Sequence, residues 1–251
     1  MLAVALAIFL WPLAYAVWMS FSPGEFLEPP TGDWSLRWYR SFFADSQWTL
    51  ALRHSFEVAA LSIVGSLVSG VGVALAVVKH RFRGQRILEA AVLFPLFVPV
   101  VVLGMALLPT MRLVGLWGTL PSIALAHTLW SMPVVFLVAR AAIAQVDVDL
   151  ELAARGLGAS ATRVLFRVTL PLIAPALWIG AMMTFILSLN EFVMALFLST
   201  PDIETLPKVI WPNLRYTLTP LVAAASGVTL ALTCIGIAVV AVFVRRGRLR
   251  I

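Results

Sequence analysis

Charged residues are scarce in this chain, and so are the residues that build phosphate sites, metal sites and disulfides. Only 12% of the 251 residues are Asp, Glu, Lys or Arg, whereas soluble domains carry about 25%. The single cysteine, Cys234, excludes an internal disulfide and a multi-cysteine metal site. The only lysines, Lys79 and Lys208, follow Val78 and Pro207, so the chain has no Gly-Lys-Ser or Gly-Lys-Thr phosphate loop. Any hydrolysis of ATP must therefore be carried out by another chain.

Catalytic patterns are also missing. The three histidines, His54, His80 and His127, fall in three separate segments, and neither a Gly-x-Ser-x-Gly nor a His-Glu-x-x-His pattern occurs. An intramembrane protease built on Ser131 and His127 is the sharpest enzyme hypothesis that remains. The net charge of +6 is spread over short clusters and forms no basic stripe, which argues against nucleic acid as a partner. We expect a non-enzymatic chain with no metal site and no cofactor of its own.

What the chain has in abundance is apolar sequence. It is 61% hydrophobic, with a mean hydropathy of +0.99, and its apolar runs reach the roughly 20 residues that a helix needs to span a bilayer. The first run lacks a basic segment and a small-residue cleavage site, so we interpret it as a retained helix. Pro95, Pro99 and Pro109 predict a kink in the third run. We predict an all-α membrane protein, a single transmembrane domain over residues 1–251, with about six spans near residues 1–20, 55–79, 88–110, 119–140, 175–198 and 221–244.

The connections between these runs predict the orientation. Cytoplasmic loops carry an excess of Lys and Arg, and here basic-rich and basic-poor connections alternate along the whole chain. Twelve of the 18 basic residues fall on one side, in the clusters 79–86, 140–167 and 245–250. We therefore expect a multi-pass membrane protein with both termini in the cytoplasm.

Two connections on the opposite side, 21–54 and 199–220, mix prolines with tryptophan and tyrosine. Aromatic residues at this level are commonly interfacial anchors in contact with lipid headgroups. The second interpretation is a contact surface for a periplasmic partner.

The cytoplasmic connection 145–171 is too polar to span the membrane and too apolar for a plain linker. It predicts two short helices: Asp147 places an acid at the start of the first, Gly158 permits a sharp turn, and Ser160 or Thr162 caps the second. Pro171 then marks a stop before the chain re-enters the membrane. Small residues at the tip suit an elbow that docks into a groove on another protein.

This stretch resembles the cytoplasmic coupling motif of type I ABC importer permeases, which reads Glu-Ala-Ala, three residues, Gly-Ala, and later Leu-Pro with a further Pro. The resemblance implies an elbow that inserts into a cleft of a nucleotide-binding subunit, so that ATP and Mg²⁺ are bound by partner chains. It also implies a second permease subunit, identical or different, and a periplasmic solute-binding protein. The matching positions are Ala153, Ala154, Gly158, Ala159, Ser160, Phe166, Leu170, Pro171 and Pro175.

One position of the motif departs from the family. Alignment on Gly158 places the glutamate of the motif at Leu152, with Glu151 one residue earlier. Two interpretations remain open. Either Glu151 replaces the missing acid after a small rotation of the helix, or docking of the elbow is more apolar than in the family.

Polar side chains within the apolar runs mark a candidate solute pathway. Polar groups at bilayer depth face the bundle interior or water, because exposure to lipid is unfavourable. Thr184, Ser188 and Glu191 share one stripe of the fifth run, with Asn190 offset beside it. His127 and Ser131 lie four residues apart in the fourth run. An acid facing a central cavity would attract a cation, whereas the competing interpretation is that these groups bond to backbone or to neighbouring helices.

The segment from Ser188 to Val193, followed by Thr205-Leu-Pro, also resembles the polyamine and organic-amine branch of these permeases. That branch commonly has an acidic pair where this chain has Asn190 and Glu191. The resemblance implies a polyamine or another organic amine as solute. An opine, an amino-acid-like solute, a phosphonate or a metal ion remains open, as does a secondary transporter, which would predict inverted repeats and ionisable relays.

Overall fold

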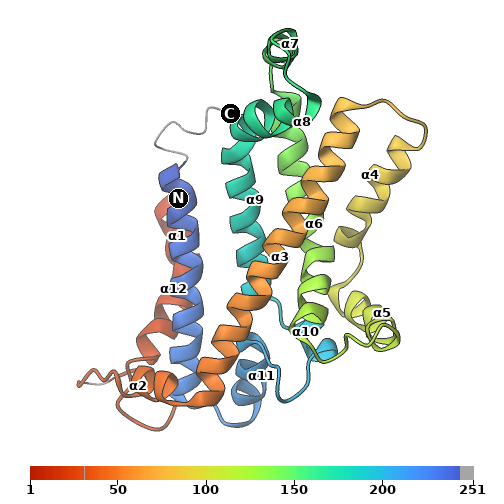
Figure 1. Cartoon of the computed structure of the whole chain (residues 1–251). Coiled ribbons are helices and arrows are strands. Elements are labelled where there is room, and N and C mark those ends of the chain that lie inside the picture. Colours follow the sequence, from red (N-terminus) through yellow and green to blue (C-terminus); the bar gives the residue numbers. More distant parts are fainter. Residues whose placement is uncertain (31, 244–251) are drawn as a thin grey trace.

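The chain folds into a bundle of helices, as its apolar composition predicts (Figure 1). The computed structural model describes residues 1–30 and 32–243. Its helices, in chain order, are α1 (Leu2–Met19), α2 (Arg37–Ala44), α3 (Ser46–Lys79), α4 (Gln85–Leu93), the 3₁₀ turn η1 (Phe94–Phe97), α5 (Val100–Leu113), α6 (Leu120–Ala144), α7 (Val148–Gly156), α8 (Ala161–Val164), the π turn η2 (Leu165–Thr169), α9 (Leu170–Asn190), α10 (Val193–Leu198), α11 (Leu206–Tyr216) and α12 (Pro220–Phe243).

In the described part of the chain, four helices are long and apolar enough to cross a membrane: α3, α6, the continuous run Ala161–Asn190, and α12. A fifth span results if the bent pair Gln85–Phe97 and Val100–Leu113 counts as one. α1 adds an apolar helix of 18 residues, near the lower limit for a crossing. An all-α membrane protein is confirmed, whereas six spans are reached only by counting both α1 and the bent pair.

The third predicted span, 88–110, is not one helix. The chain turns by 109° between η1 and α5, so that α5 lies across the bundle and packs against α10 (Figure 1). Pro95 stands in η1 and Pro99 directly precedes α5. A residue before proline is driven out of the helical region, and Val98 accordingly has an extended backbone. The prolines therefore break this span where the sequence predicted only a kink.

The fifth predicted span, 175–198, differs from the structure at both ends. The helix starts at Ala161 and passes through Pro171 without stopping. Proline lacks an N–H and crowds the carbonyl four residues earlier, and the wider π turn directly before Pro171 makes room for it. At the other end α9 stops at Asn190, and the extended backbone of Glu191 separates it from α10.

The remaining boundaries shift less. The predicted span 55–79 begins earlier, at Ser46, because the carboxylate of Asp45 accepts a hydrogen bond from the Gln47 N–H at 2.7 Å and caps the helix. The predicted spans 1–20 and 119–140 agree with α1 and α6 to within a few residues. The outer connections contain α2 and α11. The span 221–244 agrees with α12, while residue 244 and the basic cluster 245–250 lie outside the described residues.

The centre of the bundle is the crossing of α3 over α6 and α9 (Figure 1). Small and hydroxyl-bearing residues line it, as is common where membrane helices approach closely. The hydroxyls of Ser66 and Ser131 lie 2.7 Å apart, and Ser62 donates to the Ala124 carbonyl at 3.2 Å. A side chain at Gly70 would meet the backbone of α6 at 3.0 Å. These contacts join α3 directly to α6.

Candidate functional site

The predicted elbow protrudes from one end of the bundle, beyond the ends of α3, α6 and α9 (Figure 1). Its first helix, α7, begins where the Asp147 carboxylate accepts a hydrogen bond from the Asp149 N–H at 2.9 Å. Gly158 has a left-handed backbone (φ 84°), which glycine adopts without strain and which turns the chain. Ser160 caps α8 by accepting from the Arg163 N–H at 3.3 Å. Local sequence therefore builds the turn that was predicted.

The elbow exposes apolar side chains alongside charged ones, among them Arg155 and Arg163. The side chains of Leu152, Leu157 and Phe166 are exposed, and Leu157 is 90% exposed. Exposed apolar clusters of this kind mark interaction sites. The small residues of the motif share this exterior: Ala153, Gly158 and Ser160 are exposed, Ala154 and Ala159 are half-buried, and at the root of α9 Leu170 is half-buried and Pro171 exposed.

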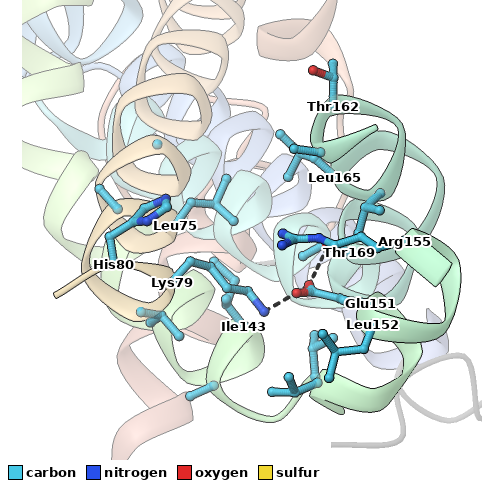
Figure 2. A pocket seen from close by; sticks show the side chains of 18 residues that line it. Leu75, Lys79, His80, Ile143, Glu151, Leu152, Arg155, Thr162, Leu165 and Thr169 are labelled. Atoms are coloured by element: carbon cyan, nitrogen blue, oxygen red, sulfur yellow. Dashed lines mark hydrogen bonds and ion pairs between the residues drawn. The ribbon is translucent and has the colours of Figure 1, made fainter. Parts of the chain in front are cut away.

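The Glu151 side chain extends into a pocket at the elbow (Figure 2). Its Oε1 atom lies 2.9 Å from Nζ of Lys79 and accepts a hydrogen bond from the Thr169 hydroxyl at 2.7 Å. Burial raises the pKa of this carboxyl group, but the hydrogen bonds from Lys79 and Thr169 and the positive charges of Lys79 and Arg155 outweigh burial, so the pKa lies below its ordinary value. The group is therefore a stable anion inside the elbow.

A cavity of about 910 Å³ lies around this ion pair, between the elbow and the nearby ends of α3 and α6. The basic residues predict that these helix ends are cytoplasmic. The walls of the cavity are mainly apolar, and Figure 2 shows Leu75, Ile143 and Leu165 among them. Lys79 and Glu151 extend into it from opposite sides. The sequence did not identify Lys79 as a site residue, because it was counted only among the basic residues of a connection. The signal that could have identified it is its rarity, since the chain has only one other lysine.

The second polar group lies at the break between α9 and α10. His127 of α6 stands between two partners, with Nδ1 2.8 Å from Oγ of Ser188 and Nε2 3.1 Å from Oε2 of Glu191. The Glu191 carboxylate also accepts from the backbone N–H groups of Met194 at 3.0 Å and Ala195 at 3.4 Å. Glu191 therefore caps α10 and ties the break to α6.

Five of the six predicted pathway residues point into the chain's own interior. Thr184, Ser188, Glu191, His127 and Ser131 are all buried, and the Glu191 side chain is only 4% exposed. The sequence left open whether Glu191 faces a central cavity or bonds to neighbouring helices, and in this chain its contacts are with α6 and α10. The sixth, Asn190, is exposed, and its side chain donates to the Ile186 carbonyl at 2.7 Å.

Among the residues that the structure describes, the Thr184 hydroxyl has no hydrogen-bond partner, whereas Ser131 donates to the His127 carbonyl at 2.6 Å. A role of these residues in solute passage stays a prediction. Among residues 1–30 and 32–243, no three His, Cys, Asp or Glu side chains are placed to hold a metal ion.

Comparison with known proteins gives this geometry a context. Residues 48–249 match the family described as the inner membrane component of binding-protein-dependent transport systems. The chain belongs to this family. It is 31% identical to the putrescine transport system permease protein PotI of Escherichia coli K12, over 90% of this chain and 82% of PotI. It is 32% identical to the molybdenum transport system permease protein ModB of the same organism, over 82% of this chain and 95% of ModB.

Solved structures agree in fold. A bacterial alginate ABC transporter, crystallised with its alginate-bound periplasmic protein, superposes with a TM-score of 0.75 at 16% identity, over 97% of this chain and 91% of that one. The MetNI methionine ABC transporter superposes with a TM-score of 0.65 at 18% identity, over 84% of this chain and 98% of that one. Family membership makes this chain a multi-pass subunit of an inner-membrane transport system. It is a transporter subunit and not an enzyme.

Proposed function

We propose that this chain forms one half of the transmembrane pathway of an ATP-driven importer for putrescine or a related organic amine. The observation that carries the importer assignment is the elbow, whose small-residue tip and exposed apolar side chains stand beyond the helix ends. The amine assignment is supported by the likeness to PotI and, at 27% identity over 79% of this chain, to the spermidine/putrescine permease protein PotC of Escherichia coli K12.

The partner at the elbow is an ATPase subunit, which supplies the binding site for ATP and Mg²⁺. Leu152, where the family motif has glutamate, is 55% exposed, while Glu151 is engaged by Lys79. Glu151 is therefore in no position to replace the missing acid on the outer surface. Of the two interpretations left open by the sequence, apolar docking is the one that the geometry supports.

The elbow end of the bundle is the cytoplasmic end. The first residues of α1 and the last turn of α12 lie at that same end (Figure 1), which supports cytoplasmic termini. The basic clusters 79–86 and 140–167 also lie there, as the positive-inside rule requires. The opposite end, with α2 and α11, then faces the periplasm and the solute-binding protein.

A second permease chain, identical or different, completes the pathway. Asn190 is the predicted pathway residue that reaches the surface, and beside it Phe192 stacks on the half-exposed Trp211 at 4.9 Å between ring centroids. Aromatic faces attract organic cations, which suits an amine. The hydrogen-bonded cluster of His127, Ser188 and Glu191 lies at the same helix break as Asn190 and Phe192.

The test is uptake by the whole transporter, purified with its co-assembling subunits and placed in vesicles. We expect labelled putrescine to enter only with ATP and the binding protein present. Molybdate is the second candidate, since ModB matches with similar identity; uptake of molybdate and not putrescine would overturn the amine assignment. Uptake driven by an ion gradient without ATP would overturn the importer itself.

A further inference from the structure

The ion pair inside the elbow joins three elements that carry different parts of the proposed mechanism. Lys79 is the last residue of α3, Glu151 lies in α7, and Thr169 ends the π turn at the root of α9. Both contacts converge on a single oxygen, Oε1 of Glu151. One carboxylate therefore connects the elbow to the central helix and to the helix that follows the elbow (Figure 2).

The surroundings of the ion pair make it the main route by which a movement of α7 reaches α3. The cavity of about 910 Å³ separates α7 from the cytoplasmic ends of α3 and α6, so apolar packing is sparse there. The Lys79 side chain is 24% exposed and that of Glu151 is 11% exposed, so water screens the pair weakly. Charge-assisted hydrogen bonds are short and directional. A displacement of α7 is thus passed to α3 by this pair more than by packing.

α3 is suited to carry such a displacement across the membrane. It is one helix of 34 residues, about 50 Å long at 1.5 Å per residue. Near its far end the Ser55 hydroxyl oxygen accepts from the Leu206 N–H at 2.8 Å, and His54 Nδ1 lies 3.1 Å from the Glu204 carbonyl. These contacts join α3 to the start of α11 on the proposed periplasmic side. A continuous set of contacts therefore connects the elbow with the opposite end.

We propose that Lys79, Glu151 and Thr169 form a strut that transmits movement of the elbow to α3 and so couples ATP hydrolysis to the opening of the pathway. The three act as positioning residues and touch neither solute nor nucleotide. This inference rests on the proposed docking of an ATPase at the elbow.

The test separates coupling from assembly. In the purified, reconstituted transporter, Glu151→Gln and Lys79→Met should retain the ATPase subunit and hydrolyse ATP within about twofold of wild type. Solute imported per ATP hydrolysed should fall at least about fivefold. The charge exchange Lys79→Glu with Glu151→Lys should restore the ratio to within about twofold, and so should the conservative change Lys79→Arg alone.

A matched control exists at the same end of the bundle. Arg140 and Glu89 form an ion pair at 2.9 Å that joins α6 to α4 and does not touch the elbow. Glu89→Gln should leave the ratio of solute to ATP unchanged. An unchanged ratio in Glu151→Gln and Lys79→Met, or an equal fall in Glu89→Gln, would overturn the strut. Loss of the ATPase subunit from these variants would also overturn it, because the pair would then maintain the elbow's fold.

A second measurement needs no disruptive variant. Spin labels at the exposed positions His80 and Asp149, in a chain with Cys234→Ser, report the separation of α3 and α7. The strut predicts the same separation with and without bound ATP. A change of more than about 5 Å, one helical turn, would contradict it. Failure of the proposed function looks different: wild type would show neither ATPase association nor ATP-dependent uptake.

Discussion

The described part of the chain contains two buried glutamates, Glu151 in the elbow and Glu191 at the break between α9 and α10, and their contacts differ in kind. Within the described residues, Glu151 is bound by the side chains of Lys79 and Thr169, which come from other elements. Glu191 is bound by His127 and by backbone N–H groups of the helix that it caps. Removal of the Glu151 carboxylate leaves no backbone group without its partner. Removal of the Glu191 carboxylate takes the partner from backbone N–H groups of α10.

This difference assigns the two acids to different tasks. Backbone N–H groups buried without a partner are strongly unfavourable, so Glu191 is part of what makes the broken helix possible. Glu151 instead joins elements that are already folded, and the cavity beside it leaves them room to move. We infer that one acid builds a local structure and the other connects separate ones.

The largest effect is expected from Glu191→Ala. The change leaves the N–H of Met194 and the ring of His127 without their partner in an apolar interior, and we expect a loss of about 3 kcal/mol of unfolding free energy. Thermal unfolding in detergent measures it. Glu57→Ala removes an exposed partner of Arg53 and serves as the control, with a change of about 0.5 kcal/mol or less.

His127→Leu tests the same cluster from the other side. It removes the ring but keeps the backbone cap of α10, so we expect a smaller loss, about 2 kcal/mol. If Glu191→Ala left unfolding unchanged and abolished uptake alone, Glu191 would act on the solute directly. The contrast between the two acids would then be wrong.

A smaller, pH-dependent effect is expected from Glu151→Gln. Its folded pKa lies below the ordinary value of 4.5, so its carboxylate stabilises the fold fully above pH 4.5, and this contribution is lost as the pH falls through the lowered pKa. We expect wild type to exceed the variant by about 1–2 kcal/mol at pH 7. The difference should shrink as the pH falls below 4.5. Unfolding curves of both proteins from pH 7 downward measure it, and a difference that does not shrink as the pH falls would contradict the ion pair.

The smallest effect on stability is expected from Leu152→Glu, which places an exposed acid beside the buried one. Because Leu152 is 55% exposed, unfolding should change by no more than about 0.5 kcal/mol. Retention of the ATPase subunit should nevertheless weaken, since a charge enters an apolar contact. Stronger retention would show that the partner still provides the salt bridge of the family motif. Leu150→Glu, also exposed but outside the motif, is the matched control.

Sequence patterns predicted the elbow in detail because its signals are local. Asp147 and Ser160 cap helices within three residues of themselves, and Gly158 turns the chain by its own backbone. The same reasoning failed at Pro171, where the π turn allowed the helix to continue, and at Glu191, where the helix stopped inside an apolar run. Neither a π turn nor a buried cap has a signature in apolar composition.

By itself, the sequence determined that this is an all-α membrane protein with two short helices in the connection 145–171, because hydropathy and helix caps depend only on neighbouring residues. Only the tertiary structure decided where the two acids point. Glu151 extends toward Lys79, which is the last residue of α3. Glu191 is enclosed because His127 of α6 packs against the break between α9 and α10. Such partners lie far apart in sequence, and a buried charge is satisfied only where folding brings them together.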